Sequence, residues 1–215
     1  KAVAKRAARR VTSAPAAVHD GRQRILEAAI RSFADVGYEG TTTASVARDA
    51  GVTQPLVHHH FGSKEGLWRA AMDHLFAGVD GFVPAADAAG AFPALLEVVD
   101  NFVRFVAARP EATRVIAREG AVAGPRLQML VDHYLRVPFA RIVELVQAGQ
   151  RAGTIRADVR PEQVLFVVLG AGSHLFDVAA LARASVGIDA GSAAVREEFA
   201  ALIRSLLQRG LVAGD

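Results

Sequence analysis

Three consecutive histidines, His58, His59 and His60, stand in the segment "VTQPLVHHHFGSKEGLW". The chain has only seven histidines, so this run is the first place to look for a metal site or acid–base chemistry. Successive residues of a helix are turned by about 100°, which points His58 and His60 to nearly opposite sides. Helical zinc pairs use i and i+4 spacing, but the i−4 and i+4 partners of His58 are Gln54 and Gly62. We predict no metal, no cofactor and no catalytic residue here, because no partner acid or nucleophile stands nearby.

The composition is that of a globular protein. A chain of 215 residues, 52% of them apolar, can form a sizeable core in one large domain or two small ones. The absence of cysteine excludes disulfides, thiolate metal ligands and a cysteine nucleophile. The longest apolar run, residues 164–172, is about half of the ~18 residues that a membrane helix needs, and residues 1–20 lack the apolar block of an export signal. We expect a cytoplasmic protein.

The formal net charge of +3 is unevenly distributed. Residues 1–10 carry five basic and no acidic side chains, whereas acidic and basic residues nearly cancel in the remainder. We expect residues 1–20 to form a basic flexible arm. Such an arm can follow nucleic acid by releasing counterions, or it can be only a solvated end, and the sequence leaves both open.

The elements that position the histidines are helices. Apolar residues recur at helical spacing along the chain, and no segment alternates with period two for long enough to be a confident strand. We predict an all-α fold of about nine helices. In the N-terminal part, residues 21–36 form a helix with Asp20 and Gln23 as a capping box and Gly37 as its stop. Thr42, Thr53 and Ser63 then cap three further helices, the first of which ends at Gly51.

The remainder is predicted to form a larger helical bundle. Helices are expected at residues 95–106, 111–119, 125–150, 161–185 and 192–208, with a kink at Pro138. The helix at 161–185 is apolar almost all round, which predicts burial on more than one side.

Ala47, Gly51 and Val57 have the spacing of a helix-turn-helix. That motif needs a small residue where its helices cross, a glycine in the turn and an apolar residue facing back from the second helix. Residues 24–68, with "FADVGYEGTT", "VARDAGV" and "HHFGSKEGL", resemble the DNA-binding domain of the TetR family of transcriptional regulators. The resemblance covers about a fifth of the chain and implies a DNA-binding domain at residues 21–66 and a ligand-binding and dimerisation domain at 67–215.

The resemblance implies a homodimeric regulator, repressor rather than activator, that leaves a roughly palindromic operator on binding a small molecule. The DNA-binding residues that it implies are Thr42, Thr43, Ala44, Thr53, Gln54, Pro55, Leu56, His58, His59 and Lys64.

Among these residues, Gln54 can offer a donor and an acceptor to a base edge, and Pro55 and Leu56 can contact a thymine methyl. Thr42 and Thr43 would meet one phosphate, and Lys64 another.

The sequence departs from the family pattern at Ala44, where a longer base-reading side chain is frequent, and at His58 and His59, where tyrosine is frequent. Imidazole can replace phenol as a phosphate donor and can gain charge near pH 6.5. His60 is expected to pack internally near Phe61.

The C-terminal domain is expected to hold an apolar pocket with a few polar groups. Candidate effector-binding residues are Asn101, Phe102, Phe105, His133, Tyr134, Phe139, His174 and Asp177. Alternatively, His174 and Asp177 satisfy each other within the core or the dimer contact. The last two helices would pair with their copies in a four-helix interface through Leu175, Phe199, Leu202, Ile203, Leu206 and Leu207.

A second hypothesis remains open on the sequence. The chain could be an all-helical enzyme or ligand-binding protein without DNA activity, with residues 58–60 as its active site. We favour the regulator and expect no enzymatic activity.

Overall fold

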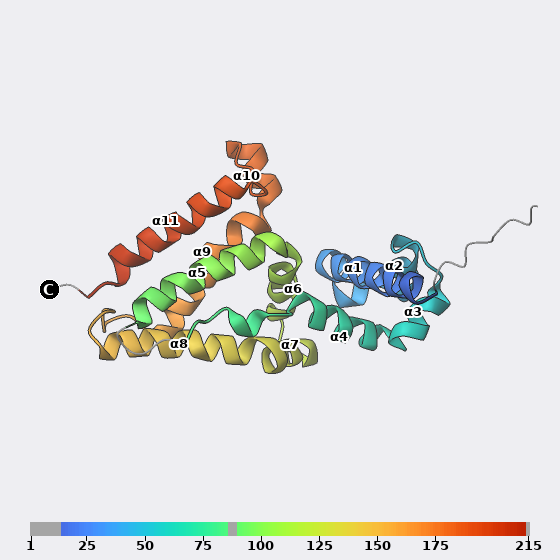
Figure 1. Ribbon diagram of the computed structural model, residues 1–215, viewed down its shortest axis with the longest axis horizontal. Coiled ribbons are helices and arrows are strands. Elements are labelled where there is room, and N and C mark those ends of the chain that lie inside the picture. Colours follow the sequence, from blue (N-terminus) through green and yellow to red (C-terminus); the bar gives the residue numbers. More distant parts are fainter. Residues whose placement is uncertain (1–13, 86–89, 214–215) are drawn as a thin grey trace, which may run out of the picture. The chain divides into compact units, whose positions relative to one another are not determined.

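The structure, a computed structural model, describes residues 14–85 and 90–213 (Figure 1). Within these ranges the chain is helical and forms no β-sheet; an isolated bridge joins Ile155 and Val212. The predicted all-α fold is confirmed. Contacts divide the chain into two compact units, Lys1–Ala71 (unit 1) and Met72–Asp215 (unit 2).

Unit 1 is built on α1 (Ala14–Gly40), α2 (Thr43–Asp49), α3 (Gln54–Phe61) and the first turns of α4 (Lys64–Leu75). Phe33 of α1 and Trp68 of α4 are each 1% exposed, and their rings meet edge to face with centroids 4.8 Å apart. Burying a phenylalanine side chain stabilises a fold by about 1.5–3 kcal/mol, and such ring pairs add to this. The start of α4 is therefore held against α1.

The predicted crossing of α2 and α3 is confirmed. Gly51 has a φ of 64°, in the left-handed region that glycine adopts without steric cost. The Val52 N–H donates to the Ala47 carbonyl at 2.9 Å and closes the turn. Val46, Ala47 and Val57 are between 0% and 3% exposed, so the inward faces of both helices are fully buried.

The start of α1 differs from the prediction. The helix begins at Ala14 rather than at Gly21, because the alanines upstream are the strongest helix formers. Asp20 therefore lies inside the helix and forms an exposed ion pair with Arg24 at 3.7 Å, so the predicted capping box at Asp20 is wrong. Gln23 donates instead to Glu27 at 3.0 Å. Residues 1–13, most of the expected basic arm, lie outside the described residues.

Unit 2 surrounds α5 (Ala91–Ala108), against which α8 (Arg136–Arg151), α9 (Pro161–Asp177) and α11 (Ala193–Leu211) pack. Its remaining segments are η1 (Val79–Gly81), α6 (Pro110–Gly120), α7 (Pro125–Leu130), η2 (Val131–Leu135) and α10 (Ala179–Val186). The inward side chains of α5 are almost completely buried, with Leu95 at 0% and Val98 at 1% exposed. This helix is the centre of the larger core.

Two of the nine expected helices are broken, which gives eleven α-helices in the described ranges. Between α7 and α8 lies one π-helical turn, η2, in which the Arg136 N–H donates to the Val131 carbonyl. Pro138 cannot donate to the carbonyl four residues earlier, and the wider turn just before it absorbs that defect.

The other break separates α9 from α10, which are bent by 68°. Among the described residues, no single helix is long and apolar enough to span a membrane; only this bent pair, taken together, has the required length and hydropathy.

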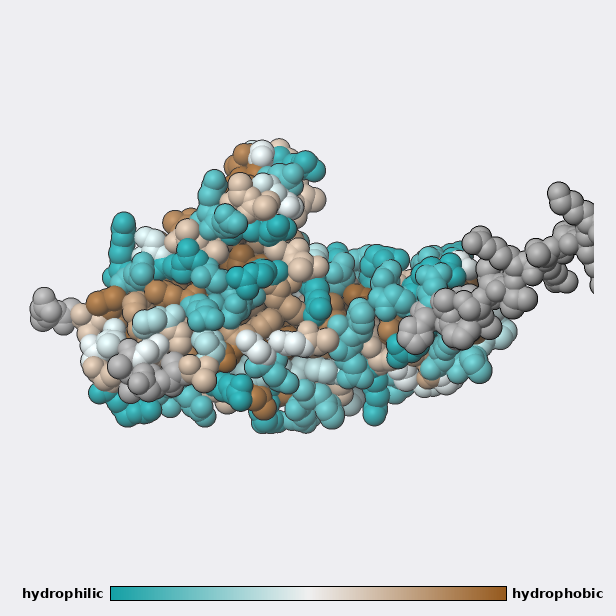
Figure 2. All heavy atoms as spheres, in the orientation of Figure 1, coloured by the Kyte–Doolittle hydropathy of each residue, from teal (hydrophilic) through white to brown (hydrophobic). Residues whose placement is uncertain are grey.

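The side chains expected to form a dimer contact divide into two groups. Ile203 and Leu207 are 4% and 7% exposed within one chain, so their assignment to the dimer surface is wrong. Leu202 and Leu206 are 53% and 60% exposed, and Leu175 and Phe199 are half-buried against the core. The predicted dimer contact included too many positions of the last helix, because neighbouring positions on a helix face different directions. Apolar side chains also lie at the surface of α10, where Leu181 and Val186 are exposed (Figure 2).

Two glycines of α9 provide a test of the packing in unit 2. A Cβ at Gly172 would lie 2.7 Å from Cδ1 of Phe102, whereas one at Gly170 would meet nothing within 4 Å. Gly172→Ala should therefore destabilise the protein by about 1–3 kcal/mol through overpacking. Gly170→Ala, the matched control, should be neutral or stabilising by up to about 1 kcal/mol, because alanine favours the helix. Urea unfolding measures both, and equal stabilities for the two variants would contradict this packing.

Candidate nucleic-acid interface and ligand cavity

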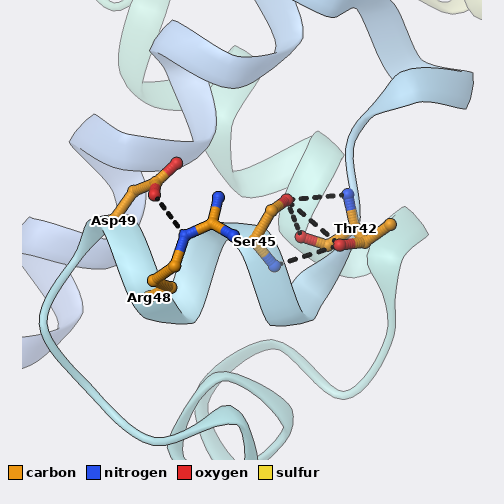
Figure 3. A network of polar contacts seen from close by, with 4 residues as sticks. All are labelled: Thr42, Ser45, Arg48 and Asp49. Atoms are coloured by element: carbon orange, nitrogen blue, oxygen red, sulfur yellow. Dashed lines mark hydrogen bonds and ion pairs between the residues drawn. The ribbon is translucent and has the colours of Figure 1, made fainter.

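Thr42 and Ser45 fix the start of α2. The Ser45 N–H donates to Thr42 Oγ1 at 3.0 Å, and the Thr42 N–H donates to Ser45 Oγ at 3.2 Å (Figure 3). This reciprocal capping box confirms Thr42 as the N-cap. Thr42 is exposed, but its hydroxyl already serves the helix; a phosphate at this end would meet the first backbone N–H groups of α2.

Thr43, Gln54 and His58 form a polar cluster on the exposed side of α2 and α3. Gln54 Nε2 donates to Thr43 Oγ1 at 3.1 Å and lies 3.5 Å from His58 Nε2. Thr43 Oγ1 is 3.4 Å from the same His58 nitrogen. The structure thus brings together three of the expected DNA-binding residues, and the amide of Gln54 is held by two neighbours rather than rotating freely.

The hydrogen bonds of His58 indicate which ring nitrogen carries the proton when the side chain is neutral. Nδ1 lies 3.2 Å from the Gly62 carbonyl, which can only accept, so Nδ1 carries the proton and Nε2 accepts from Thr43 or Gln54. Neutral His58 in this arrangement has no N–H left for a phosphate. The expectation that it donates to phosphate therefore requires either protonation or reorientation of the ring.

His59 and His60 differ in their surroundings. His59 is exposed, whereas the His60 ring packs 6.0 Å from the Phe61 ring, and its Nε2 is buried without a hydrogen-bond partner among the described atoms. Desolvation, together with the nearby His59 and Arg22, lowers the pKa of His60 from its usual value. Within the part of the chain that the structure describes, no group of three His, Cys, Asp or Glu side chains is arranged to hold a metal ion.

The remaining expected DNA contacts are not equally available. Thr53, Pro55 and Ala44 are exposed. Leu56 is half-buried, and its Cδ2 would lie 3.7 Å from a Cβ at Gly21, so this side chain packs toward α1 rather than facing outward.

Lys64 is likewise engaged within unit 1. Its Nζ lies 4.3 Å from the centroid of the Tyr38 ring and donates to the Glu39 carbonyl at 3.5 Å. A phosphate contact by Lys64 would have to replace or extend these interactions.

A separate feature lies in unit 2, where a cavity of about 280 Å³ is bounded by α5, α6, α8 and α9. Its lining is mostly apolar and includes six phenylalanines, Phe76, Phe82, Phe102, Phe105, Phe139 and Phe166. The polar side chains that line it are Thr113, Ser173 and Asp177. An apolar concave space with a few polar groups at one place is typical of a small-molecule site.

Four of the expected effector-binding residues line this cavity: Phe102, Phe105, Phe139 and Asp177. The other four do not. Asn101 donates to the Phe82 carbonyl at 3.1 Å, Tyr134 donates to Asp73 at 2.6 Å, and His133 and His174 are exposed.

Within one chain Asp177 accepts a hydrogen bond from Thr113, while His174 is exposed; a pairing of His174 with Asp177 at a dimer contact stays a prediction. Sequence reasoning missed Thr113, because no local pattern relates it to a carboxylate on a distant helix.

Comparison with known families gives two matches. Residues 25–71 match the family described as bacterial regulatory proteins, tetR family, and residues 93–207 match the tetracyclin repressor-like C-terminal domain. The second match alone covers more than half of the chain.

Individual relatives agree with this assignment. The chain is 43% identical over 54 residues to the HTH-type transcriptional regulator BetI of Burkholderia thailandensis, a match that covers 25% of this chain and 28% of that protein. It is 27% identical over 194 residues to the HTH-type transcriptional repressor SCO4008 of Streptomyces coelicolor, covering 87% and 95% of the two chains. The fold is similar to that of AibR, solved with isovaleryl coenzyme A and operator DNA, with a TM-score of 0.68, 20% identity, and coverage of 86% and 97%.

The lowered pKa of His60 predicts a stability that falls in acid. Below pH 6.5 the unfolded chain binds a proton more readily than folded His60 does, so stability present above that pH is lost as the pH falls. Urea unfolding at pH 7.5 and 5.5 should therefore show a larger loss for the wild type than for His60→Asn. An NMR titration should place the pKa of His60 below 6.5. An equal loss in both proteins, or a higher pKa, would contradict this description.

Proposed function

The chain belongs to the TetR family of bacterial regulatory proteins, and we propose that it is a DNA-binding repressor that leaves its operator when a small molecule occupies the cavity of unit 2. The operator is roughly palindromic and is bound by a homodimer. The observation that carries the proposal is the capped α2 and the exposed α3, which present Thr43, Gln54 and His58 together on one surface.

In this proposal α3 enters the major groove and α2 crosses the backbone. Gln54 reads a base edge with its amide, because that group offers both a donor and an acceptor. Pro55 lies beside it on the exposed face and supplies an apolar contact. Thr43, Thr53, His59 and Lys64 are assigned to the phosphates, together with the backbone N–H groups that follow the capping residue Thr42. The small side chain of Ala44 leaves space rather than a contact.

The homodimer is supported by apolar side chains that one chain leaves at its surface. Leu202 and Leu206 of α11 and Val167 of α9 are each more than half exposed. Exposed leucines on a long helix gain stability when a second copy covers them in a two-fold contact. The proposed dimer surface therefore differs from the one predicted from the sequence: Ile203 and Leu207 are left out, because they belong to the core of one chain.

Regulation by a small molecule is supported by the cavity and by the related fold of AibR, whose structure holds isovaleryl coenzyme A together with operator DNA. The ligand must bind more tightly to the conformation that does not fit the operator, because only differential affinity shifts the population.

The enzyme alternative has less support, and we propose that the protein is not an enzyme. Residues 58–60 do not act as one site: His58 bonds toward Gly62 and α2, while His60 packs on Phe61.

A role on DNA also assigns the protein to the cytoplasm.

The DNA-reading role of Gln54 can be tested by fluorescence anisotropy on the DNA that flanks the protein's own gene. Gln54→Ala should reduce the preference for the specific site over unrelated DNA by about tenfold, because it removes a base contact of about 1–3 kcal/mol. Lys64→Gln should weaken binding to both DNAs alike and reduce the salt slope by about 0.9. Gln23→Ala, exposed on α1, is the control and should behave like the wild type. An unchanged preference in Gln54→Ala would contradict the proposed reading surface, and no specific complex at low salt would contradict regulation.

A further inference from the structure

Among the described residues, the lining of the unit 2 cavity has one acidic side chain and no basic one. Of the described residues that line it, Asp177 is ionisable, and none is lysine, arginine or histidine. Arg109 lies over the Phe105 ring at 5.5 Å, but its guanidinium donates to the carbonyls of Leu75 and Ala77 at 3.1 and 2.9 Å. The carboxylate therefore faces an apolar space without a cation from the lining.

The position of Asp177 in α9 favours a positively charged partner. Asp177 is the last residue of the helix, where the free carbonyl groups carry partial negative charge. Its hydrogen-bond donor is the Thr113 hydroxyl, which is neutral and has one proton, and the Pro110 carbonyl, 3.1 Å from Thr113 Oγ1, competes for that proton. A carboxylate in such surroundings is stabilised by a cation or a strong donor that enters the cavity.

The rest of the lining is suited to the same kind of group. Six phenylalanines line the cavity, and aromatic rings attract ammonium and guanidinium ions and also pack on apolar groups; the Phe105 ring already has the Arg109 guanidinium 5.5 Å from its centroid. Ser173 stands one helical turn before Asp177, so its hydroxyl faces the same end of the cavity and can accept a further N–H.

We infer that the effector is a small lipophilic amine, whose ammonium group binds Asp177 at the end of α9 and whose apolar body lies among the phenylalanines. This inference rests on the proposed function, since it names the class of molecule that occupies the proposed regulatory site. An acyl coenzyme A does not fit this description, because the lining offers its phosphates no basic side chain within the described part of the chain.

Three probes with one apolar body separate the ligand classes: phenylbutylamine, phenylbutanol and phenylbutanoate. They are cationic, neutral and anionic near neutral pH. Isothermal titration of the full-length protein without DNA should show the amine binding about tenfold more tightly than the alcohol, and the carboxylate most weakly. Wild-type protein that binds the alcohol or carboxylate as well as the amine, or that binds none of the three, would overturn the inference.

Asp177→Asn tests the residue itself. The asparagine oxygen can still accept from Thr113, so the fold should be kept, and the melting temperature checks this. The preference for the amine over the alcohol should fall to about one. Asp189→Asn removes one negative charge from an exposed ion pair with Arg183 and should keep the wild-type preference. A preserved preference in Asp177→Asn would overturn the inference.

A separate measurement, fluorescence anisotropy of labelled operator DNA with the protein, tests the proposed function. If the amine binds but no operator complex forms, the repressor proposal fails and the ligand class stands. If the operator complex forms but the amine is not preferred, the ligand class fails and DNA binding stands.

Discussion

The packing of Val57 on α3 against Val46 and Ala47 on α2 is the contact on which the DNA-facing surface depends. These three side chains are at most 3% exposed, and protein interiors leave little room for an added group. Gly51 allows the close turn between the helices, and the Thr42–Ser45 capping box fixes the start of α2. Because the inner face of α3 can sit in only one way, its outer face presents Gln54 and His58 in a defined orientation.

In unit 2, too, the buried and exposed sides of single helices have different roles. On α11, Ile203 and Leu207 stabilise the single chain, while Leu202 and Leu206, one position earlier in each case, remain at the surface for a second copy. On α9, Gly172 allows close approach of the Phe102 ring, and Asp177 brings a carboxylate to the end of an apolar cavity. One helix set therefore supports the core, the proposed dimer surface and the proposed ligand site.

Features encoded within a few residues were predictable from the sequence: the caps at Thr42 and Ser63, the left-handed Gly51, the helical periods and the separation of the three histidines. The capping box at Asp20 was not, and Thr53 makes no side-chain cap hydrogen bond. Features that depend on distant residues were not. Thr113 reaches Asp177 across the bundle, Lys64 lies over Tyr38, and Leu56 packs toward Gly21. Periodicity also cannot tell a straight helix from a broken one. The kink expected at Pro138 marked the place of the π-helical turn just before it, but nothing in the period indicated the bend between α9 and α10. The candidate DNA surface was thus largely visible beforehand, whereas half of the cavity assignments were not.

Methylation interference and hydroxyl-radical footprinting on the DNA flanking the protein's own gene test the central claim most directly. A dimer that presents two copies of α3 should give two symmetric major-groove contacts, with centres about 34–36 Å apart or at a multiple of that spacing. Protection confined to the minor groove, or a single asymmetric contact, would contradict the assignment of α3 as the element that reads DNA.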